Sequence, residues 1–318
     1  MQPTNFIQLY APSDVRAELA AGLLAPVATT SAKYLYDALG SKLFEAICEL
    51  PEYYPTRTES AIFAAHLDAI AAAAGSGTTL IDLGAGNCAK AARLFAALEP
   101  VQYVPVDISV EFLRDSVGLL QRRFPEVQML GLGLDFSTSL DLPDAVRRER
   151  RLFFYPGSSI GNFSPAEALV FLRRLRAACD ADGALLIGVD LVKEKSLLDA
   201  AYDDALGVTA CFNLNLLLHL NTLLGADFRL ADWQHRGFFN GAESRIEMHL
   251  EAREQVDVSW PGGARRFRAG ERIHTENSYK YRQPAAVGLL EQAGFGAARV
   301  WTDPQGWFAL IYARALPA

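Results

Sequence analysis

The sequence predicts an α/β protein, with a doubly wound parallel sheet that ends in an antiparallel hairpin and a second, discontinuous lobe. Short apolar runs alternate with helical patterns between residues 79 and 189, which is typical of βαβ units in a sheet buried on both faces. Two further apolar runs near the C-terminus are joined by a turn that contains proline and glycine, which predicts a hairpin. The sheet domain is expected over 60–192 and 286–318, and the second lobe over 1–59 and 193–285.

The N-terminal segment is expected to consist of helical pieces separated by turns. Asp14 is placed to cap an alanine- and leucine-rich helix that stops near Pro26. Residues 41–50 form a second short helix. Pro55 interrupts the aromatic and polar segment that follows, and a longer helix is expected over 60–74.

The sheet domain alternates strictly between the two element types. Strands are expected at 79–83, 103–106, 127–130, 151–155 and 183–189. Helices are expected at 88–98, 110–124 and 165–178. Crossovers between parallel strands are right-handed, so the helices cover both faces of the sheet.

The alternation stops after residue 190. Residues 195–228 are expected to be wholly helical, and residues 245–258 alternate apolar and polar side chains, which predicts a strand with one exposed face. A helix at 287–293 precedes the hairpin strands at 298–302 and 308–314. A doubly wound sheet with a terminal antiparallel hairpin is the outline of a class I methyltransferase with a Rossmann-like sheet.

Composition excludes several classes of protein. The 318 residues are 51% hydrophobic and 21% charged, which is globular rather than disordered composition. The net charge of -7 provides no general basic field, so we expect no nucleic-acid partner. The N-terminus lacks a signal-peptide pattern, and no apolar run reaches the ~18 residues of a membrane span. From these two absences we expect no membrane partner and a cytoplasmic location. The four cysteines form no C-x-x-C pair, so we expect reduced thiols.

A glycine turn after the first expected strand is the strongest local motif. Asp82 precedes Gly84 and Gly86, and a helix pattern follows. Glycines let the backbone turn sharply and let a ligand approach it closely. Asp107 ends the next strand, where a carboxylate accepts hydrogen bonds from ribose hydroxyls. The turn also satisfies G-x-G-x-x-A, so a dinucleotide site has to be weighed against other nucleotide cofactors.

The rest of the chain separates these alternatives. No tyrosine is followed by a lysine four residues later, and nothing else indicates a hydride-transfer site. A carboxylate before the glycines, as at Asp82, is more typical of S-adenosylmethionine sites. Asp135 and Phe136 follow the third strand, where such enzymes hold the adenine. S-adenosylmethionine is therefore favoured, while NAD(P) and a turn without a ligand remain alternatives.

Several longer motifs indicate a particular family. They are Leu35-Tyr36-Asp37, LPEYYPTRTE at 50–59, PGSSIGNF at 156–163, AYDDALGVTA at 201–210, RIEM at 245–248, TENS at 275–278 and WTDP at 301–304. In these motifs the chain resembles the ergothioneine-pathway L-histidine Nα-methyltransferases, from about Leu35 to the C-terminus. The resemblance implies transfer of three methyl groups from S-adenosylmethionine to the α-amine of L-histidine, giving hercynine. The glycine turn departs slightly, because it reads Gly-Ala-Gly rather than Gly-Ser-Gly.

The resemblance also implies roles for individual residues. The substrate carboxylate and amine are expected at Tyr53, Gly161, Asn162 and Tyr202. Tyr36, Tyr53 and Asn162 are the expected catalytic residues, because they lie in the motifs that approach the reacting amine. The imidazole is expected between Glu276 and Ser278, in a pocket lined by Thr209, Phe212 and Met248. The cofactor residues are Asp82, Gly84, Gly86, Lys90, Asp107, Asp135 and Phe136.

Taken singly, several of these residues have simpler interpretations. Tyr202, Phe212 and Met248 would each fit a hydrophobic core, and Glu276 a solvated strand. Asp203-Asp204 lacks accompanying ligands and the five histidines include no i, i+4 pair, so we expect no metal. Three alternatives to this function remain. They are a methyltransferase that acts on another amino acid, a sensor of cofactor or amino acid without turnover and, as the weakest, a dehydrogenase. The family resemblance implies a monomer that acts on free L-histidine.

Overall fold

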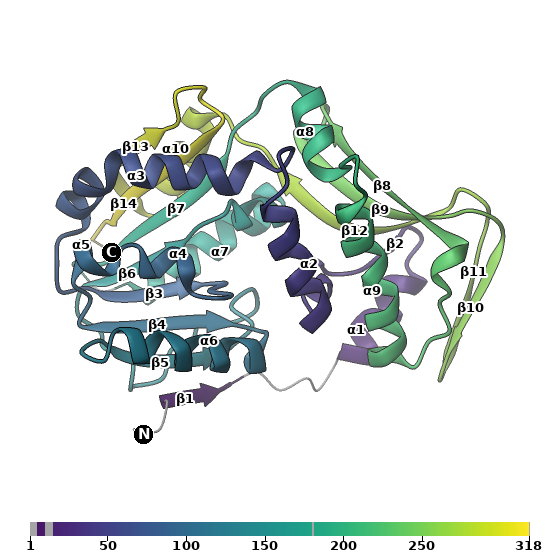
Figure 1. Cartoon of the computed structure of the whole chain (residues 1–318), viewed down its shortest axis with the longest axis horizontal. Helices are drawn as coiled ribbons and strands as arrows, with labels where there is room; N and C mark the ends of the chain where they lie inside the picture. The colour runs from purple at the N-terminus through teal and green to yellow at the C-terminus, as the bar shows by residue number, and fades with distance from the viewer. Residues whose placement is uncertain (1–4, 10–14, 180, 318) are drawn as a thin grey trace. The chain divides into compact units, whose positions relative to one another are not determined.

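The computed structural model describes residues 5–9, 15–179 and 181–317, so Asp14 and its expected cap lie outside the described residues. The chain divides into two compact units (Figure 1). The sheet unit comprises residues 1–11, 55–192 and 281–318. The lobe comprises residues 12–54 and 193–280. Among the described residues, no helix is long and apolar enough to cross a membrane.

The sheet unit is built on one mixed sheet. Its described strands lie in the order β1-β5-β4-β3-β6-β7-β14-β13. The first six of these are parallel, whereas β14 runs antiparallel to both β7 and β13. The strands are β1 (Asn5–Gln8), β3 (Thr79–Leu83), β4 (Gln102–Asp107), β5 (Gln128–Gly133), β6 (Arg151–Tyr155), β7 (Ala184–Asp190), β13 (Phe295–Thr302) and β14 (Phe308–Ala315). The order reverses direction between β3 and β6, and the expected class I methyltransferase fold with its C-terminal hairpin is confirmed.

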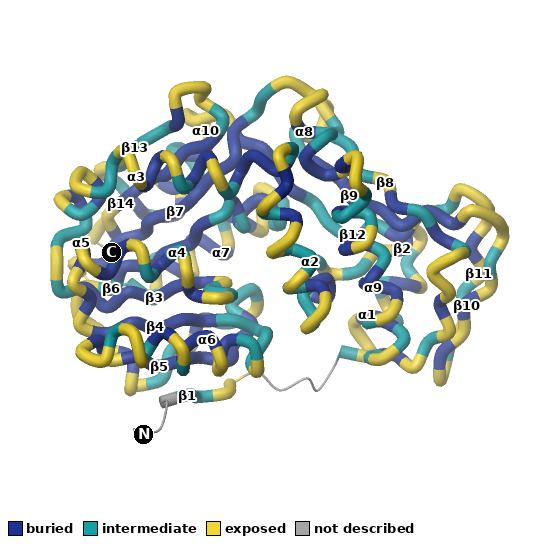
Figure 2. The backbone as a smooth tube through the Cα atoms, in the orientation of Figure 1, coloured by how far each residue is buried: buried dark blue, intermediate teal, exposed yellow. Residues whose placement is uncertain are grey.

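Helices pack against this sheet, and its six inner strands are almost wholly buried, whereas the edge strands β1 and β13 are partly exposed (Figure 2). The helices are α3 (Tyr54–Ala74), α4 (Ala89–Ala92), α5 (Phe95–Leu98), α6 (Val110–Arg123), the 3₁₀ helix η2 (Ser159–Asn162), α7 (Pro165–Ala178) and α10 (Gln283–Gln292). Ser164 and Glu167 form a capping box that begins α7. α6 packs on β4 and β5, while α10 packs on the C-terminal hairpin. The resulting core is continuous from α3 through β3 to β14.

Three expectations for this unit are wrong. Residues 5–8 form β1, which pairs in parallel with β5, so this segment belongs to the sheet unit and not to the lobe. α3 begins at Tyr54 rather than residue 60, because Pro55 lies in the first helical turn, where a missing N–H costs nothing. The expected single helix over 88–98 is two short helices, α4 and α5, which are separated at Arg93 and Leu94.

The lobe contains a four-stranded sheet, a separate hairpin and several helices. The sheet order is β2-β12-β9-β8, from strands β2 (Ala28–Thr29), β8 (Trp233–Asn240), β9 (Arg245–Ala252) and β12 (Arg272–Tyr279). The hairpin pairs β10 (Val256–Trp260) with β11 (Gly263–Phe267). The helices are α1 (Val15–Leu24), η1 (Ala32–Leu35), α2 (Ala38–Cys48), α8 (Lys195–Tyr202), α9 (Val208–Leu224) and η3 (Leu230–Asp232). Helix α9 packs against α2, β8 and β9.

The expected continuous helix over 195–228 is interrupted. Gly207 adopts a positive φ of 76°, which ends the connection from α8 and starts α9. The Asp204 carboxylate caps α9, because it accepts hydrogen bonds from the backbone N–H groups of Val208 (3.0 Å) and Thr209 (2.7 Å). Tyr202 therefore ends one helix, while Thr209 and Phe212 begin the next.

The expected strand with an exposed face is also different from the prediction. Residues 245–258 divide between β9 and β10, and the polar side chains of β9 are buried. The reason is that β9 lies between β12 and β8, and side chains of these strands, such as Phe238 and Arg272, cover its polar residues.

A β-bulge decides which residues of β12 share the face of Met248. His274 pairs with His249, but Glu276 pairs with Met248, so the register shifts between these two pairs. In an unbroken ladder Thr275 would oppose Met248, and Glu276 would oppose Glu247. Because a one-residue shift moves side chains to the opposite face, the bulge places Glu276 beside Met248.

Candidate active site

The glycine turn of the sheet unit lies at the carboxyl end of β3. Gly84 and Gly86 have φ angles of 70° and 52°, a region that side chains with a Cβ rarely adopt. The Asp107 carboxylate at the end of β4 accepts hydrogen bonds from the N–H groups of Gly86 (3.0 Å) and Ser109 (2.9 Å). The structure therefore brings the expected Gly84, Gly86 and Asp107 together at one edge of the sheet.

Asp82 is a buried carboxyl whose hydrogen bonding is incomplete. One oxygen accepts a hydrogen bond from the Tyr103 hydroxyl at 2.7 Å. The other oxygen is buried and has no hydrogen-bond partner among the described residues. Burial raises the pKa of Asp82 to about 7, and the Tyr103 hydrogen bond offsets this only in part. A carboxyl with an unfilled buried oxygen beside a glycine turn fits a ligand that carries donors or positive charge.

Replacing Asp82 by asparagine is expected to stabilise the ligand-free protein more at pH 8 than at pH 5. The folded pKa of about 7 lies above the unfolded value, so wild type loses stability as pH rises toward 7. The amide cannot ionise and keeps an oxygen for Tyr103. The difference between the variant and wild type should grow by about 3 kcal/mol between these pH values, measured by urea unfolding. Asp144→Asn, at an exposed site, is the control, and a pH-independent difference for Asp82→Asn would contradict the argument.

Lys90 is held by a residue that the sequence analysis did not select. Its Nζ donates to the buried Glu59 carboxylate at 2.7 Å, and Glu59 also accepts from the Gly157 N–H at 2.7 Å. Glu59 therefore joins α3 to the helix after the glycine turn and to the loop before η2. Gly161 and Asn162 lie in η2, so Glu59 helps to fix the backbone of that segment.

Asp135 and Phe136 follow β5 at the same edge of the sheet. Asp135 accepts hydrogen bonds from the backbone N–H (3.1 Å) and the hydroxyl of Ser137. The Phe136 ring packs edge-on against Tyr155, with centroids 5.8 Å apart, and lies against Phe171. Its ring also lies 3.9 Å from the position of a Cβ on Gly84. The structure thus assembles the carboxyl ends of β3, β4 and β5 into one candidate cofactor site.

The lobe contains a cluster of aromatic rings. Tyr36 contacts Phe44 and Phe212 with ring centroids 5.5 Å apart in both pairs. Tyr53 contacts Phe44 at 6.0 Å and Tyr202 at 6.1 Å, in both cases edge-to-face. Burial raises the pKa of Tyr53 well above its ordinary value, so the side chain is a neutral phenol near pH 7.

Polar side chains of β12 lie next to this cluster. The Ser278 hydroxyl oxygen is 2.9 Å from the Tyr202 hydroxyl and 2.8 Å from Lys280 Nζ. Lys280 Nζ is also 3.1 Å from the Tyr202 hydroxyl. Burial of the carboxyl raises the pKa of Glu276 to about 7, against the opposing effect of the Lys280 charge. Glu276, Ser278 and Tyr202 are therefore brought together, with Lys280 among them.

The remaining expected pocket residues lie on the same side of the small sheet. Met248 pairs with Glu276 across the bulge and is buried. Phe212 and Thr209 are buried on α9, which packs on β9. The Thr209 hydroxyl has no hydrogen-bond partner within the described parts of the chain. The buried carboxyl beside it is that of Asp204, which also accepts the Thr209 backbone N–H.

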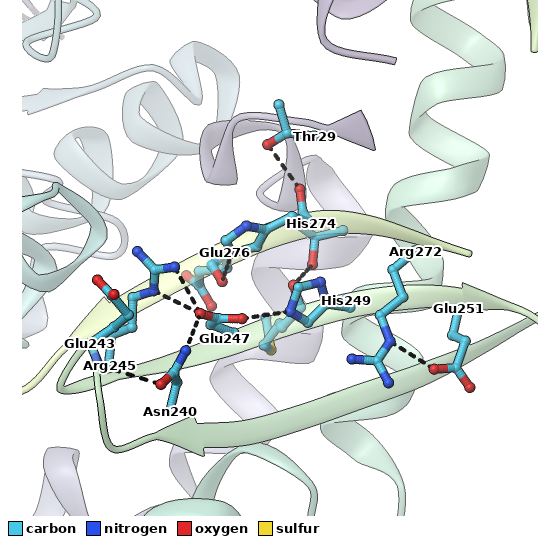
Figure 3. A network of polar contacts seen from close by, with 12 residues as sticks. Thr29, Asn240, Glu243, Arg245, Glu247, His249, Glu251, Arg272, His274 and Glu276 are labelled. Atoms are coloured by element: carbon cyan, nitrogen blue, oxygen red, sulfur yellow. Dashed lines mark hydrogen bonds and ion pairs between the residues drawn. The ribbon is translucent and has the colours of Figure 1, made fainter. Parts of the chain in front are cut away.

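By strand register, a different polar group lies on the face of this sheet opposite to Met248. Figure 3 shows its residues. Glu247, His249 and His274 have side-chain ligand atoms within 4.8 Å of one another. The Glu247 carboxylate accepts hydrogen bonds from Arg245 Nε (2.9 Å), Asn240 Nδ2 (3.0 Å) and His249 Nε2 (3.0 Å). The Arg245 guanidinium balances the charge of the Glu247 carboxylate, and Asn240 and His249 add neutral hydrogen bonds. Sequence spacing did not reveal this group, because cross-strand register brings the two histidines together.

Sequence reasoning also missed Glu59, Phe44 and Lys280. A pattern for Lys280 was present, since Glu276, Ser278 and Lys280 follow at intervals of two, the period of one strand face. Glu59 is the last residue of the LPEYYPTRTE motif, but neither its contacts nor those of Phe44 follow from local spacing, because they depend on tertiary packing.

The model of one protein family matches residues 15–315, and its description is histidine-specific methyltransferase, SAM-dependent. The chain belongs to this family. It is 39% identical to the histidine N-alpha-methyltransferase of Mycolicibacterium smegmatis over 305 residues, covering 94% of each chain. It is also 39% identical to the enzyme of that name from Mycobacterium tuberculosis over 306 residues, again 94% of each. Ergothioneine biosynthesis protein 1 of Neurospora crassa is 30% identical over 276 residues, which are 84% of this chain and 31% of that protein.

Membership confirms the family expected from the sequence motifs. It also confirms an S-adenosylmethionine-dependent histidine methyltransferase with a class I fold. The dinucleotide alternative for the glycine turn is thereby wrong. The carboxyl-rich edge of the sheet unit agrees with S-adenosylmethionine as the methyl donor.

Proposed function

We propose that this protein transfers three methyl groups from S-adenosylmethionine to the α-amine of L-histidine, giving hercynine for ergothioneine biosynthesis. The observation that carries the choice of acceptor is the pair formed by Glu276 and Ser278. The bulge in β12 turns the Glu276 carboxyl to the face of Met248, and Ser278 follows on that face. A carboxylate and a hydroxyl two residues apart match the two ring nitrogens of an imidazole.

The cofactor is assigned to the sheet unit. Asp82 is proposed to face the amino-acid end of S-adenosylmethionine, since one of its buried oxygens has no partner within the described residues. Asp107 is proposed to accept hydrogen bonds from the ribose hydroxyls, and Asp135 with Phe136 to hold the adenine. Gly84 and Gly86 have no side chains, so the cofactor can lie close to the backbone of the turn. Lys90 supports the turn through its ion pair with Glu59. S-adenosylmethionine supplies an electrophilic methyl group on a sulfonium.

The substrate's amino-acid end is assigned to Tyr53, Gly161, Asn162 and Tyr202, with Tyr36 beside the amine. Methyl transfer needs a free amine aligned with the donor, and alignment alone contributes about 7–11 kcal/mol in well-oriented reactions. The nearby sulfonium lowers the proton affinity of the amine by like-charge proximity. No strong protein base is then required. The raised pKa of Tyr53 supports this role, because the oxygen of a neutral phenol accepts an amine N–H and thereby aims the lone pair at the methyl group.

Replacing Tyr36 or Tyr53 by phenylalanine is expected to lower the rate of each methyl transfer by about 10- to 100-fold, in the lower range of proton-relay contributions. The rings and their packing remain, so the substrate pocket should keep its shape. Single-turnover mass spectrometry of the mono-, di- and trimethylated products gives the three rates. Tyr34→Phe is the control, since this buried tyrosine lies against His219 outside the aromatic cluster. Unchanged rates in both variants would contradict the proposed roles.

The activity itself is tested by incubating the protein with S-adenosylmethionine and each of the twenty amino acids. Mass spectrometry should detect three added methyl groups on histidine alone. Methylation of another amino acid would overturn the assignment of Glu276 and Ser278, but not that of the cofactor site. Cofactor binding without any product would indicate a sensor instead.

The proposal also covers the oligomeric state, the cellular location and the binding partners of the protein. We take it to be a cytoplasmic monomer that uses no metal and binds neither nucleic acid nor membrane. The net charge of -7 supports the exclusion of nucleic acid. Light scattering after size exclusion tests the monomer, and activity after extensive dialysis against a chelator tests the independence from metal.

A further inference from the structure

Lys280 is a buried cation beside the proposed imidazole pocket. It is 3% exposed, and its ammonium is 2.8 Å from the Ser278 oxygen and 3.1 Å from the Tyr202 oxygen. The same Nζ lies 4.8 Å from the centroid of the Tyr202 ring. An ammonium only donates hydrogen bonds, so both hydroxyl oxygens act as acceptors toward it.

The direction of the remaining hydrogen bond follows from acidity. The two hydroxyl oxygens of Tyr202 and Ser278 are 2.9 Å apart, so one must donate to the other. A phenol is more acidic than an alcohol, and the neighbouring ammonium strengthens it further as a donor. Tyr202 therefore donates to Ser278. The Ser278 oxygen then accepts two hydrogen bonds, which uses both of its lone pairs.

This arrangement leaves the Ser278 hydroxyl able to donate a hydrogen bond but not to accept another. Its own proton is free to point at a ligand, but its oxygen has no capacity to accept. Glu276, two residues earlier on β12, presents an acceptor when ionised. The site thus offers one donor and one acceptor. A neutral imidazole carries one N–H and one bare nitrogen, whereas an imidazolium carries two N–H groups and would face the Ser278 proton with one of them.

We propose that Lys280 is a positioning residue that makes Ser278 an obligate donor, so that the pocket binds the neutral imidazole ring and rejects the imidazolium. This inference rests on the proposed function, because it takes histidine as the ligand. The Lys280 charge acts in the same direction, since it repels a second cation in the pocket. It also favours the ionised form of Glu276, whose pKa it lowers.

The direct test is ¹⁵N NMR of ring-labelled histidine bound to the protein with S-adenosylhomocysteine, between pH 6 and pH 8. In wild type, one ring nitrogen should be protonated and the other bare even at pH 6, below the usual histidine pKa of about 6.5. In Lys280→Met, Ser278 regains a lone pair and the repulsion is removed. Both ring nitrogens should then be protonated at pH 6. Lys280→Arg keeps the charge and should resemble wild type.

The pH dependence of kcat/KM gives a second test, because a purely structural role of Lys280 would not change it. Relative to wild type, Lys280→Met should gain about 10-fold in kcat/KM as the pH falls from 8 to 6, because only the variant accepts the protonated ring. An imidazolium bound to wild type, or an unchanged ring state and a pH-independent loss in Lys280→Met, would overturn the role of Lys280. Failure of wild type to bind or methylate histidine would instead overturn the proposed function, and this inference with it.

Discussion

Replacing Glu276 by alanine is expected to lower kcat/KM for histidine by about 10⁴-fold, the lower end of the range reached by sites that recognise a substrate through buried hydrogen bonds. The variant leaves an imidazole N–H without an acceptor in a site that water reaches poorly. Ser278 and Lys280 would then present only donors and positive charge to the ring. Steady-state kinetics at pH 8, where Glu276 is ionised given its pKa of about 7, measure the effect.

Two further variants make this result specific. Glu276→Gln keeps the size of the side chain but offers an amide, so a loss of about 10- to 100-fold is expected from the charge alone. Glu247→Gln is the matched control, because Glu247 lies on the neighbouring strand but on the opposite face of the sheet. If Glu276→Ala kept the preference for histidine over other amino acids, the imidazole would have to bind elsewhere.

Replacing Asp107 by alanine is expected to weaken S-adenosylmethionine binding by about 100-fold or more. Two hydrogen bonds between ribose hydroxyls and a carboxylate would be lost, each worth about 1.5–3 kcal/mol when one partner is charged. The same carboxylate holds the N–H groups of Gly86 and Ser109, so its loss also loosens the glycine turn. Isothermal titration calorimetry gives the dissociation constant directly.

Asp144→Ala provides the control for this variant, because Asp144 is an exposed aspartate of the same unit, paired with Arg148. Its cofactor affinity should match wild type. An unchanged dissociation constant in Asp107→Ala would place the ribose away from the end of β4. A lower melting temperature alone would not account for the expected result, since binding is measured on the folded fraction.

The sheet unit was largely predictable because its signals are local. Each buried parallel strand is a short apolar run, and each is separated from the next by a helical pattern. The glycine turn follows β3 directly, and Asp107 ends the next strand, so adjacency in the sheet follows from adjacency in sequence. β1 escaped prediction because four residues at the chain start carry no periodic pattern, and only pairing with β5 makes them a strand.

The lobe was less predictable because its contacts join distant segments. β8, β11 and β12 were not identified as strands, since their polar and aromatic residues carry no clear alternation. The polar residues of β9 were expected to be exposed, yet side chains from the neighbouring strands β8 and β12 cover them. The aromatic cluster joins Tyr36, Tyr53 and Tyr202, which come from three separate segments.

By itself, the sequence determined the alternating fold, the carboxylates at the ends of neighbouring strands and, through its motifs, the family. These depend on residue types at fixed spacings along one segment. Tertiary structure alone decided that the β12 bulge turns Glu276 toward Met248. It also decided that Lys280 donates hydrogen bonds to the Ser278 and Tyr202 hydroxyls. Strand register and hydrogen-bond direction are set by partners from other segments, so no local pattern encodes them.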